Sequence, residues 1–571
     1  MIDYKDIIAG LISEYLAGPE KDEIASMIEV PADEKMGDYA FPCFKLARTL
    51  RKAPPMIAKD IAGALGGSEI FSRVENVNAY VNMYINRENF IKELINDVRK
   101  KGERYGRSDI GAGKKVIVEY SSPNIAKPFH IGHIRSTVIG NSIYKIYDFL
   151  GYDTVRINHL GDYGTQFGKM ICAYRHWGNK EDVTEEPIKT LLGYYTKFHA
   201  EAQKDPSLDQ EARDIFTKLE HGEKEETELW QWFRDESLKE FSRVYKMLGI
   251  EFDSYAGESF YSDKMPRFVQ ELKDKGLLKK SEGAQIVELD EYGLSPALIT
   301  KSDGSTLYIT RDIAAAVYRK EHYDFYKNLY VVSSGQMLHF QQWIQIVEML
   351  GYEWARDCVH IPFGLVSLED GTMSTREGRV VFLEDVLNRA VEKTREIIKE
   401  KNVNTDNIEK TASQVGIGAV IFQELSNNRI KDYVFSWDRV LNFDGETGPY
   451  VQYTHARAAS VLRKAGAEAA EKASAAAVDP SYINSDRAYE LVKLIYAMPE
   501  VIAEAGEKYE PSIVTRHLIN IAQAFNRFYH DEHILVDDED EKIAKLALVY
   551  ASKTAIKNSL GLLGIEAPEK M

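Results

Sequence analysis

Cysteine is scarce in this sequence, and long apolar runs are absent. Only Cys43, Cys172 and Cys358 occur among its 571 residues, far apart and outside the spacings of zinc sites. We therefore expect a reducing, cytoplasmic location and no structural metal. No apolar stretch approaches the roughly 18 residues that a membrane-spanning helix needs. No signal-peptide pattern follows Met1, so neither a membrane protein nor a secreted one is expected.

Basic side chains are also in deficit. The chain has 72 Lys and Arg against 89 Asp and Glu, a net charge of −17. This balance argues against a general nucleic-acid binder and against DNA as a partner. An RNA partner would have to be held by a local basic surface. The apolar content of 44% and charged content of 28% are typical of globular proteins, and the length predicts two to four domains.

The most informative segment runs from residue 115 to 159. Its β-branched block, residues 116–118, predicts a buried parallel strand. From Ile134 to Leu150 the apolar residues recur every three or four positions, which predicts a helix. Val155 lies in a second β-branched run. The segment is therefore predicted to be a βαβ unit of an α/β fold, with a right-handed connection.

Two histidines, His130 and His133, lie where this strand passes into the helix, with Gly132 between them. Free backbone N–H groups and the helix dipole attract phosphate at such a junction. The glycine allows close approach, and both imidazoles can donate to oxygens that gain charge in a transition state. Two structural histidines are one alternative. A metal pair is another, disfavoured because the nearby sequence offers no third ligand.

The residues from Ser121 to His133 read Ser-Ser-Pro-Asn-Ile-Ala-Lys-Pro-Phe-His-Ile-Gly-His. This run resembles the form of the His-Ile-Gly-His signature found in arginyl-tRNA synthetases, a family of class I aminoacyl-tRNA synthetases. The four-residue signature alone also suits other adenylyltransferases. The resemblance implies a Rossmann-like catalytic domain that activates L-arginine with ATP and Mg²⁺ and passes it to its tRNA. It also suggests that adenylate formation waits for bound tRNA.

The resemblance covers nearly the whole chain and implies three domains. Residues 1–105 would form an N-terminal α/β domain that contacts the tRNA elbow. Residues 106–385 would form the catalytic domain, with a charged helical insertion at about 169–290 that is too short for a separate editing domain. Residues 386–571 would form a helical anticodon-binding bundle. We expect a monomer.

Tyr308 and Asp312 lie four residues apart where the sequence predicts a hairpin, residues 298–310, to pass into a helix. The Asp303-Gly304 pair would supply its turn. A carboxylate at position 312 suits the planar donors of a guanidinium, although an Asp at a helix start is commonly structural. The resemblance assigns the arginine substrate to Glu119, Ser122, Asn124, Tyr308, Asp312 and Gln336.

The resemblance also implies a second signature motif, Lys-Met-Ser-Lys-Ser, after a predicted strand at residues 359–367. The resemblance assigns ATP to His130, Gly132, His133, His339, Val366, Met373 and Ser374. The motif's usual lysines are replaced by Thr372 and by Thr375 or Arg376, depending on register. The charge that should neutralise pyrophosphate therefore falls to Arg376. We predict that Lys127 supplies the missing ammonium; the alternative is a solvated surface lysine.

Candidate tRNA contacts lie near both ends of the chain. Tyr80 and Asn82, on an alternating run at residues 77–86, could stack on and hydrogen-bond an unpaired base. The alternative, that Tyr80 is a core residue and Asn82 a polar residue at a strand edge, has at least equal weight. Tyr453 and Arg457 lie on a basic helix expected at residues 448–463. The last residues of the sequence resemble the end of arginyl-tRNA synthetases, which makes Met571 a further candidate.

Two other functions are alternatives to this interpretation. A glutamyl or cysteinyl ligase of the same class would need a different amino-acid pocket from Tyr308, Asp312 and Gln336. A tRNA-binding scaffold without activity would be expected to have lost one of the signature histidines or Asp312. His130, His133 and Asp312 are all present.

Overall fold

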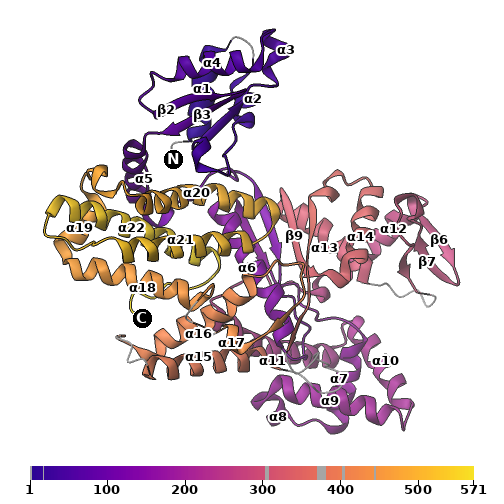
Figure 1. Ribbon diagram of the computed structural model, residues 1–571. Coiled ribbons are helices and arrows are strands. Elements are labelled where there is room, and N and C mark those ends of the chain that lie inside the picture. Colours follow the sequence, from indigo (N-terminus) through magenta and orange to yellow (C-terminus); the bar gives the residue numbers. More distant parts are fainter. Residues whose placement is uncertain are drawn as a thin grey trace. The chain divides into compact units, whose positions relative to one another are not determined.

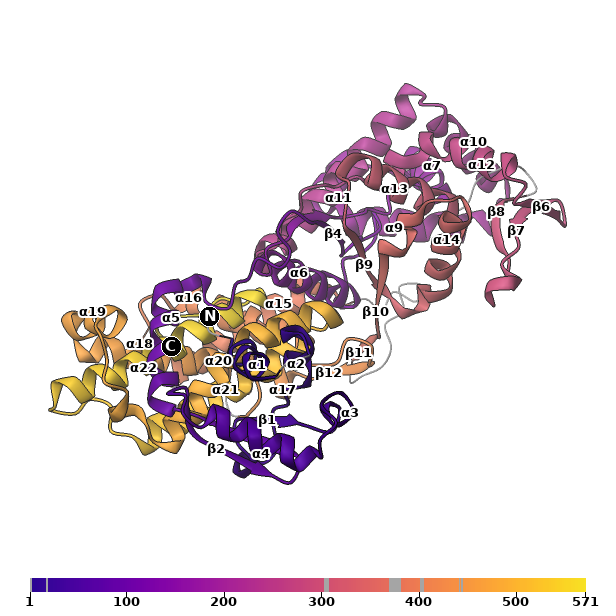
Figure 2. The same ribbon diagram turned by 90° about the horizontal axis from the view of Figure 1, so that it is seen from above.

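The computed structural model describes residues 3–16, 19–301, 308–368, 381–400, 405–440, 442 and 445–571. The chain divides into two compact units. The first comprises residues 1–105, 457–498 and 520–556, and the second comprises residues 106–456, 499–519 and 557–571. Each is described by itself (Figures 1 and 2).

The N-terminal part of the first unit is a small α/β arrangement. Its elements are α1 (Tyr4–Tyr15), α2 (Lys21–Met27), β1 (Tyr39–Pro42), α3 (Leu46–Leu50), α4 (Pro54–Leu65), β2 (Phe71–Val77), β3 (Tyr80–Ile85) and α5 (Arg87–Lys101). The strands form an antiparallel sheet in the order β1-β3-β2. The alternating run at 77–86 thus corresponds to β3. Because β3 is the central strand, the strand-edge interpretation of Asn82 is wrong.

A parallel sheet organises the second unit. It contains β4 (Lys115–Glu119), β5 (Asp153–Ile157), β9 (Lys327–Ser333) and β10 (Cys358–Phe363), in the order β10-β9-β4-β5. Helix α6 (Ile134–Phe149) connects β4 to β5, which confirms the βαβ unit predicted from the sequence. The strand order changes direction between β4 and β9. Open α/β sheets bind ligands at the carboxyl ends of strands at such a point.

A largely helical segment separates β5 from β9. It contains α7 (Thr165–Trp177), α8 (Lys180–Glu185), α9 (Pro187–Ala202), α10 (Ser207–Glu220), α11 (Lys224–Leu248) and α12 (Met265–Asp274). Three strands, β6 (Leu278–Ser281), β7 (Ala284–Val287) and β8 (Ala297–Thr300), then form an antiparallel sheet. The insertion at about 169–290 is thus mainly helical.

The hairpin predicted at residues 298–310 is wrong. β8 pairs with β7, and the chain from Tyr308 already belongs to helix α13 (Tyr308–Tyr323). The proposed Asp303-Gly304 turn lies outside the described residues. The β-branched residues before Arg311 favour a strand locally, but Ile309 and Ile313, four apart, both enter the core as helical neighbours. Tertiary burial has overridden local propensity.

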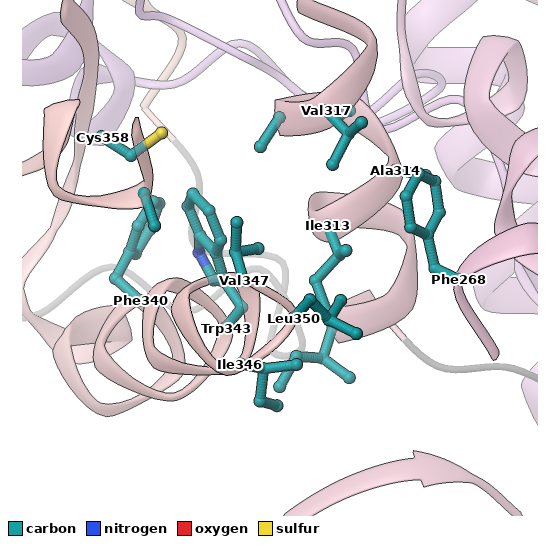
Figure 3. Close-up of a cluster of buried hydrophobic side chains, with 14 of the residues drawn as sticks. Phe268, Ile313, Ala314, Val317, Phe340, Trp343, Ile346, Val347, Leu350 and Cys358 are labelled. Carbon is teal, nitrogen blue, oxygen red and sulfur yellow. The ribbon is translucent and has the colours of Figure 1, made fainter. Parts of the chain in front are cut away.

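An apolar core holds the helices on the parallel sheet. Figure 3 shows α14 (Met337–Met349) presenting Phe340, Trp343 and Val347 to this core, opposite Ile313 of α13. The same cluster includes Ile117 of β4. This packing fixes the N-terminal parts of α13 and α14, which carry Asp312 and His339.

The predicted strand at residues 359–367 is two strands in different sheets. β10 ends at Phe363, and β11 (Val366–Leu368) pairs in parallel with β12 (Tyr433–Phe435). Gly364 permits the change of direction because a Cβ there would lie 2.6 Å from the Ile430 carbonyl oxygen. β11 therefore lies just beyond the carboxyl end of β10 and belongs to a separate sheet with β12.

Helices dominate the remainder of the chain. They are α15 (Leu383–Glu400), α16 (Ile408–Leu425), α17 (Trp437–Val440), α18 (Gly448–Ala465), α19 (Ala467–Ala475), α20 (Asp486–Lys508), α21 (Ser512–Asp531) and α22 (Glu539–Leu562). Short 3-10 helices span Glu34–Met36, Gly102–Arg104, Ile131–His133, Glu258–Lys264, Asp290–Tyr292, Ser334–Gln336, Glu353–Asp357 and Pro480–Ile483. Across the described residues, every helix is too short or too polar to span a bilayer.

Candidate active site

A cavity of about 470 Å³ opens at the carboxyl edge of the parallel sheet. The residues around it come from the ends of β4, β9 and β10, from β11, and from the start of the α6 segment. They are Ser121, Ser122, His130, Gly132, His133, Ser136, Val331, Val332, Ser333, Phe363, Gly364, Leu365, Val366 and Ser367. The volume is in the range of small-molecule sites. The structure thus brings Ser122 and Val366 together with both signature histidines.

The two histidines cap each other's backbone. His130 Nδ1 accepts a hydrogen bond from the Gly132 amide at 3.0 Å, and His133 Nδ1 accepts one from the His130 amide at 3.2 Å. Because an accepting Nδ1 carries no proton, a neutral ring has its proton on Nε2. Both rings line the cavity. His130 is therefore a donor through Nε2. His133 Nδ1 also lies 3.3 Å from the His130 carbonyl oxygen, and His133 is a donor through Nε2 in the tautomer that accepts from the amide.

Burial keeps both rings uncharged. It lowers the pKa of His133 to about 3, with the electrostatic effects of His130 and Lys127 acting in the same direction. Burial also lowers the pKa of His130. Near pH 7 the pair therefore offers two neutral donors. Lys127 itself is exposed and is close enough to His133 to act on it.

The loop between β4 and the histidines has a strained backbone. Ser121, Ser122 and Ala126 all have positive φ, at 71°, 46° and 56°, which costs non-glycine residues of the order of 1–3 kcal/mol each. The Ser121 amide donates to Ser136 Oγ on α6, and its hydroxyl lies 2.8 Å from the Tyr245 hydroxyl of α11. These buried contacts hold the loop in a conformation that brings Ser122 to the cavity.

Asp312 and His339 form a close pair between two helices. Asp312 Oδ2 lies 2.5 Å from His339 Nε2. Tyr308 lies one turn before Asp312 on α13 and is 58% exposed. His339 is therefore placed beside a predicted arginine-binding carboxylate and is not among the residues that line the cavity. Its assignment to the nucleotide stays a prediction.

Glu258 is a carboxylate near Asp312 that the sequence did not reveal. Its Oε2 lies 3.1 Å from Arg311 Nη1. Burial, helped by the charges of Asp312 and Asp162 and opposed by Arg311, raises the pKa of Glu258 to about 7. The sequence offered no signal for it, because Glu258 lies 54 residues before Asp312 along the chain, at the start of a 3-10 helix.

The buried residues at the ends of β4 and β5 include two polar groups of interest. Glu119 is paired with Arg319, whose Nη1 lies 2.5 Å from the carboxylate, so this predicted arginine ligand already has a partner within the protein. Asn158 is buried and donates to the Tyr245 hydroxyl at 2.9 Å, while its Oδ1 has no hydrogen-bond partner. A buried acceptor without a donor suits a ligand's ammonium group. Its position just after β5 was the available sequence signal.

The other predicted catalytic residues lie on the surface or outside the described ranges. Asn124 is exposed and forms a parallel bridge with Gly161. Gln336 is exposed at the end of a 3-10 helix just before α14. Thr372, Met373, Ser374, Thr375 and Arg376 all lie outside the described residues.

The predicted tRNA contacts differ in exposure. Tyr80 is half-buried and its ring packs edge-on against Phe44, which is 55% exposed. Asn82 is 2% exposed, with its amide against Met36 Sδ. The ring of Tyr453 on α18 is partly exposed.

The two remaining tRNA candidates lie in different units. Arg457 donates to Asn526 and lies over the Tyr529 ring, 5.4 Å from its centroid. Met571 is half-buried at the chain end.

Comparison with known proteins gives matches along the whole chain. Residues 94–437 match the family model described as tRNA synthetases class I (R), catalytic domain. Residues 3–85 match the arginyl tRNA synthetase N terminal domain, and residues 451–571 match the DALR anticodon binding domain.

Curated relatives and solved structures agree with these matches. The arginine–tRNA ligases of Halothermothrix orenii and Clostridioides difficile are each 57% identical to the chain over 100% of both sequences. The arginyl-tRNA synthetase structure from Thermus thermophilus has a TM-score of 0.82 at 24% identity, with 99% of both chains covered. That from Plasmodium falciparum has a TM-score of 0.77 at 23% identity, covering 99% of this chain and 98% of that one.

Proposed function

Because the chain belongs to the arginyl-tRNA synthetase family and is a class I arginine–tRNA ligase, we propose roles for its site residues in ATP-dependent activation of arginine. His130 and His133 donate from Nε2 to the phosphate oxygens of ATP. The observation that carries this role is the occupation of both Nδ1 atoms by backbone amides. Each proton is thereby committed to the nitrogen that can reach a ligand in the cavity.

The first step joins arginine to AMP. A carboxylate oxygen of arginine attacks the α-phosphorus, and the bond from that phosphorus to the pyrophosphate oxygen breaks. Negative charge grows on the non-bridging and leaving oxygens, where the two Nε2–H donors stabilise it. ATP enters as its Mg²⁺ complex. The terminal ribose hydroxyl of tRNA then attacks the arginyl carbonyl, and AMP leaves.

The guanidinium is held by carboxylates at one end of the arginine site. Asp312 accepts two of its N–H groups, Glu258 supplies a second negative charge, and Tyr308 and Gln336 complete this end. Glu119, Ser122 and Asn124 hold the α-amino and carboxylate groups, and Asn158 Oδ1 adds an acceptor for the amino group. A neutral analogue leaves these charges unmatched. Discrimination of about 10⁴-fold or more then needs no editing site.

The charge on Glu258 makes arginine binding depend on pH. Its pKa of about 7 lies above the ordinary value of 4.5, so the carboxyl group is mostly neutral at pH 6 and ionised at pH 8. Only the ionised form attracts the guanidinium. We expect KM for arginine to fall by up to about 10-fold from pH 6 to pH 8. In Glu258→Gln this dependence should disappear, and the pH 8 value should rise; a wild-type KM that is flat across this range would exclude the role.

Ionisation of Glu258 has the opposite effect on the stability of the folded state. Without substrate, the raised pKa destabilises the folded state as the pH rises from about 4.5 to about 7, because only the unfolded chain then ionises readily. Thermal unfolding of wild type and Glu258→Gln at pH 5 and pH 8 separates this effect from substrate binding.

The leaving pyrophosphate is neutralised by side chains that replace the usual second-motif lysines. Lys127 supplies one positive charge from the loop before the histidines, and its effect on the pKa of His133 supports this position. Arg376 supplies another, and Met373, Ser374, Val366 and His339 contact the nucleotide. The protein acts as a monomer in the cytoplasm. Tyr80, Asn82, Tyr453, Arg457 and Met571 contact the tRNA.

Arginine-dependent ATP–pyrophosphate exchange tests this scheme. The purified protein is assayed with and without tRNA bearing an arginine anticodon. We expect exchange when that tRNA is present and little without it. Equal exchange in both conditions would remove the tRNA requirement. Its absence in both, despite tRNA binding, would remove the proposed site chemistry.

A further inference from the structure

Helices α7 and α10 bring three metal-ligating side chains together outside the catalytic cavity. Cys172 and His176 lie four residues apart on α7, so they share one face of that helix, and Glu211 lies on α10. The sulfur, an imidazole nitrogen and a carboxylate oxygen all lie within 4.8 Å of one another. Within the described part of the chain, this is the one cluster of three such groups.

The packing of the two helices holds this cluster in place. Gly168 lies one turn before Cys172, and a Cβ at Gly168 would come within 2.1 Å of the Ala212 carbonyl oxygen. The absence of a side chain at Gly168 therefore lets α10 approach α7 closely, directly beside Glu211 (Figure 1). His176 Nε2 lies 3.0 Å from Glu211 Oε2. Two of the three ligand groups are thus already in contact.

The three side chains differ in burial, and the sulfur is the most buried. Cys172 is fully buried, whereas the side chains of His176 and Glu211 are 41% and 42% exposed. An ion can enter from solvent between the latter two and reach the sulfur inside. An ordinary surface ion pair needs only a carboxylate and an imidazole. The buried sulfur beside them distinguishes this cluster from such a pair.

We propose that Cys172, His176 and Glu211 bind one Zn²⁺ ion, with water as the fourth ligand. Thiolate, imidazole and carboxylate are the ligands that Zn²⁺ takes in proteins, in a tetrahedron with bonds of about 2.0–2.3 Å. Ligand atoms on such an ion lie about 3.3–3.8 Å apart. The three ligand atoms lie within 4.8 Å of one another, so adjustments of about 1–1.5 Å at most bring them to this spacing.

Binding removes the proton of Cys172 and fixes the tautomer of His176. Cys172 releases its thiol proton to solvent and binds as thiolate. The imidazole of His176 binds in its neutral form with the proton on Nδ1, so that the Nε2 lone pair reaches the ion. Glu211 exchanges its hydrogen bond from His176 for a bond to Zn²⁺. The ion then clamps α7 to α10.

The clamp has a mechanical connection to the active site. Helix α7 begins at Thr165, directly after the loop of residues 158–164 that carries Asn158 and Asp162. Fixing α7 against α10 therefore fixes the helix into which this loop runs. Zn²⁺ is expected to raise the Tm of the full-length protein, whether or not substrates are present.

Cobalt spectroscopy and zinc competition test the site on the reduced, chelator-treated full-length protein. Co²⁺ reports a thiolate ligand by a charge-transfer band in the near ultraviolet, and Zn²⁺ affinity is measured against a chromophoric chelator. We expect one ion per chain. Cys172→Ser should abolish the band. His176→Asn, at an exposed position, should weaken Zn²⁺ binding by at least the roughly 10–100-fold that loss of a ligand's hydrogen-bond partner costs.

Matched controls address the other buried thiols and surface histidines. Cys43→Ser removes another buried cysteine, and His221→Asn removes an exposed histidine just after α10; both should bind as wild type. The proposal is overturned if the wild type shows no band, if the band persists in Cys172→Ser, or if His176→Asn retains full affinity. Circular dichroism of each variant confirms that folding is intact.

Discussion

Asp312→Asn is expected to lower kcat/KM for arginine by about 10⁴-fold while leaving KM for ATP nearly unchanged. The amide keeps the size of the carboxylate but offers one acceptor oxygen and no charge. Its NH₂ group is itself a donor and cannot pair with the donors of the guanidinium. The contact between Asp312 and His339 weakens in the same variant. Arginine-dependent pyrophosphate exchange at varied arginine concentration measures the effect.

Asp324→Asn is the matched control for this prediction. Asp324 follows the same helix, its side chain is 90% exposed, and its backbone is left-handed at φ 47°, a conformation that asparagine tolerates. It should behave as wild type. If Asp312→Asn retains the wild-type KM for arginine, the guanidinium is held elsewhere, and Glu258 becomes the first candidate.

Replacing either signature histidine by alanine is expected to lower kcat by about 10²–10³-fold, with KM for ATP and arginine changed little. Each variant loses one donor that acts on charge developing in the transition state. It also loses one backbone cap, because His130 and His133 accept from the amides of Gly132 and His130. Single-turnover formation of the adenylate separates this loss from any effect on binding.

Two further variants set the scale of the histidine result. His130→Asn restores a short donor and should recover part of the loss. Lys127→Ala removes an exposed charge, so we expect a smaller decrease in turnover, about 10-fold, with substrate binding intact. Unchanged turnover in Lys127→Ala would assign the pyrophosphate charge to other residues. Weakened ATP binding without loss of kcat in His130→Ala or His133→Ala would contradict the transition-state role.

The sequence predicted the catalytic framework well because its signals are local. The β-branched block at residues 116–118 and the helical period from Ile134 each depend on a few neighbouring residues. They matched β4 and α6. The segment before Arg311 failed because the helix there is determined by burial in a core contributed by distant elements, including α14 and β4.

The candidate site was predictable only where a motif is contiguous. His130, Gly132 and His133 lie together in sequence and in the cavity. Glu258 reaches Asp312 from 54 positions away along the chain. The pairing of Asp312 with His339 depends on the angle between two helices, and nothing in the period of either helix specifies that angle.

The reciprocal capping of His130 and His133 also limits what these rings can do. A histidine relays a proton by accepting at one nitrogen and releasing at the other, and here the second nitrogen of each ring is occupied by a backbone amide. Attack by a carboxylate that is already ionised needs no relay, so the arrangement suits that step. The ribose hydroxyl of tRNA must shed a proton when it takes the amino acid, and this proton has to leave by a path that avoids both rings. A phosphate oxygen of the departing AMP gains basicity as its bond to the carbonyl breaks, and it can chemically accept this proton.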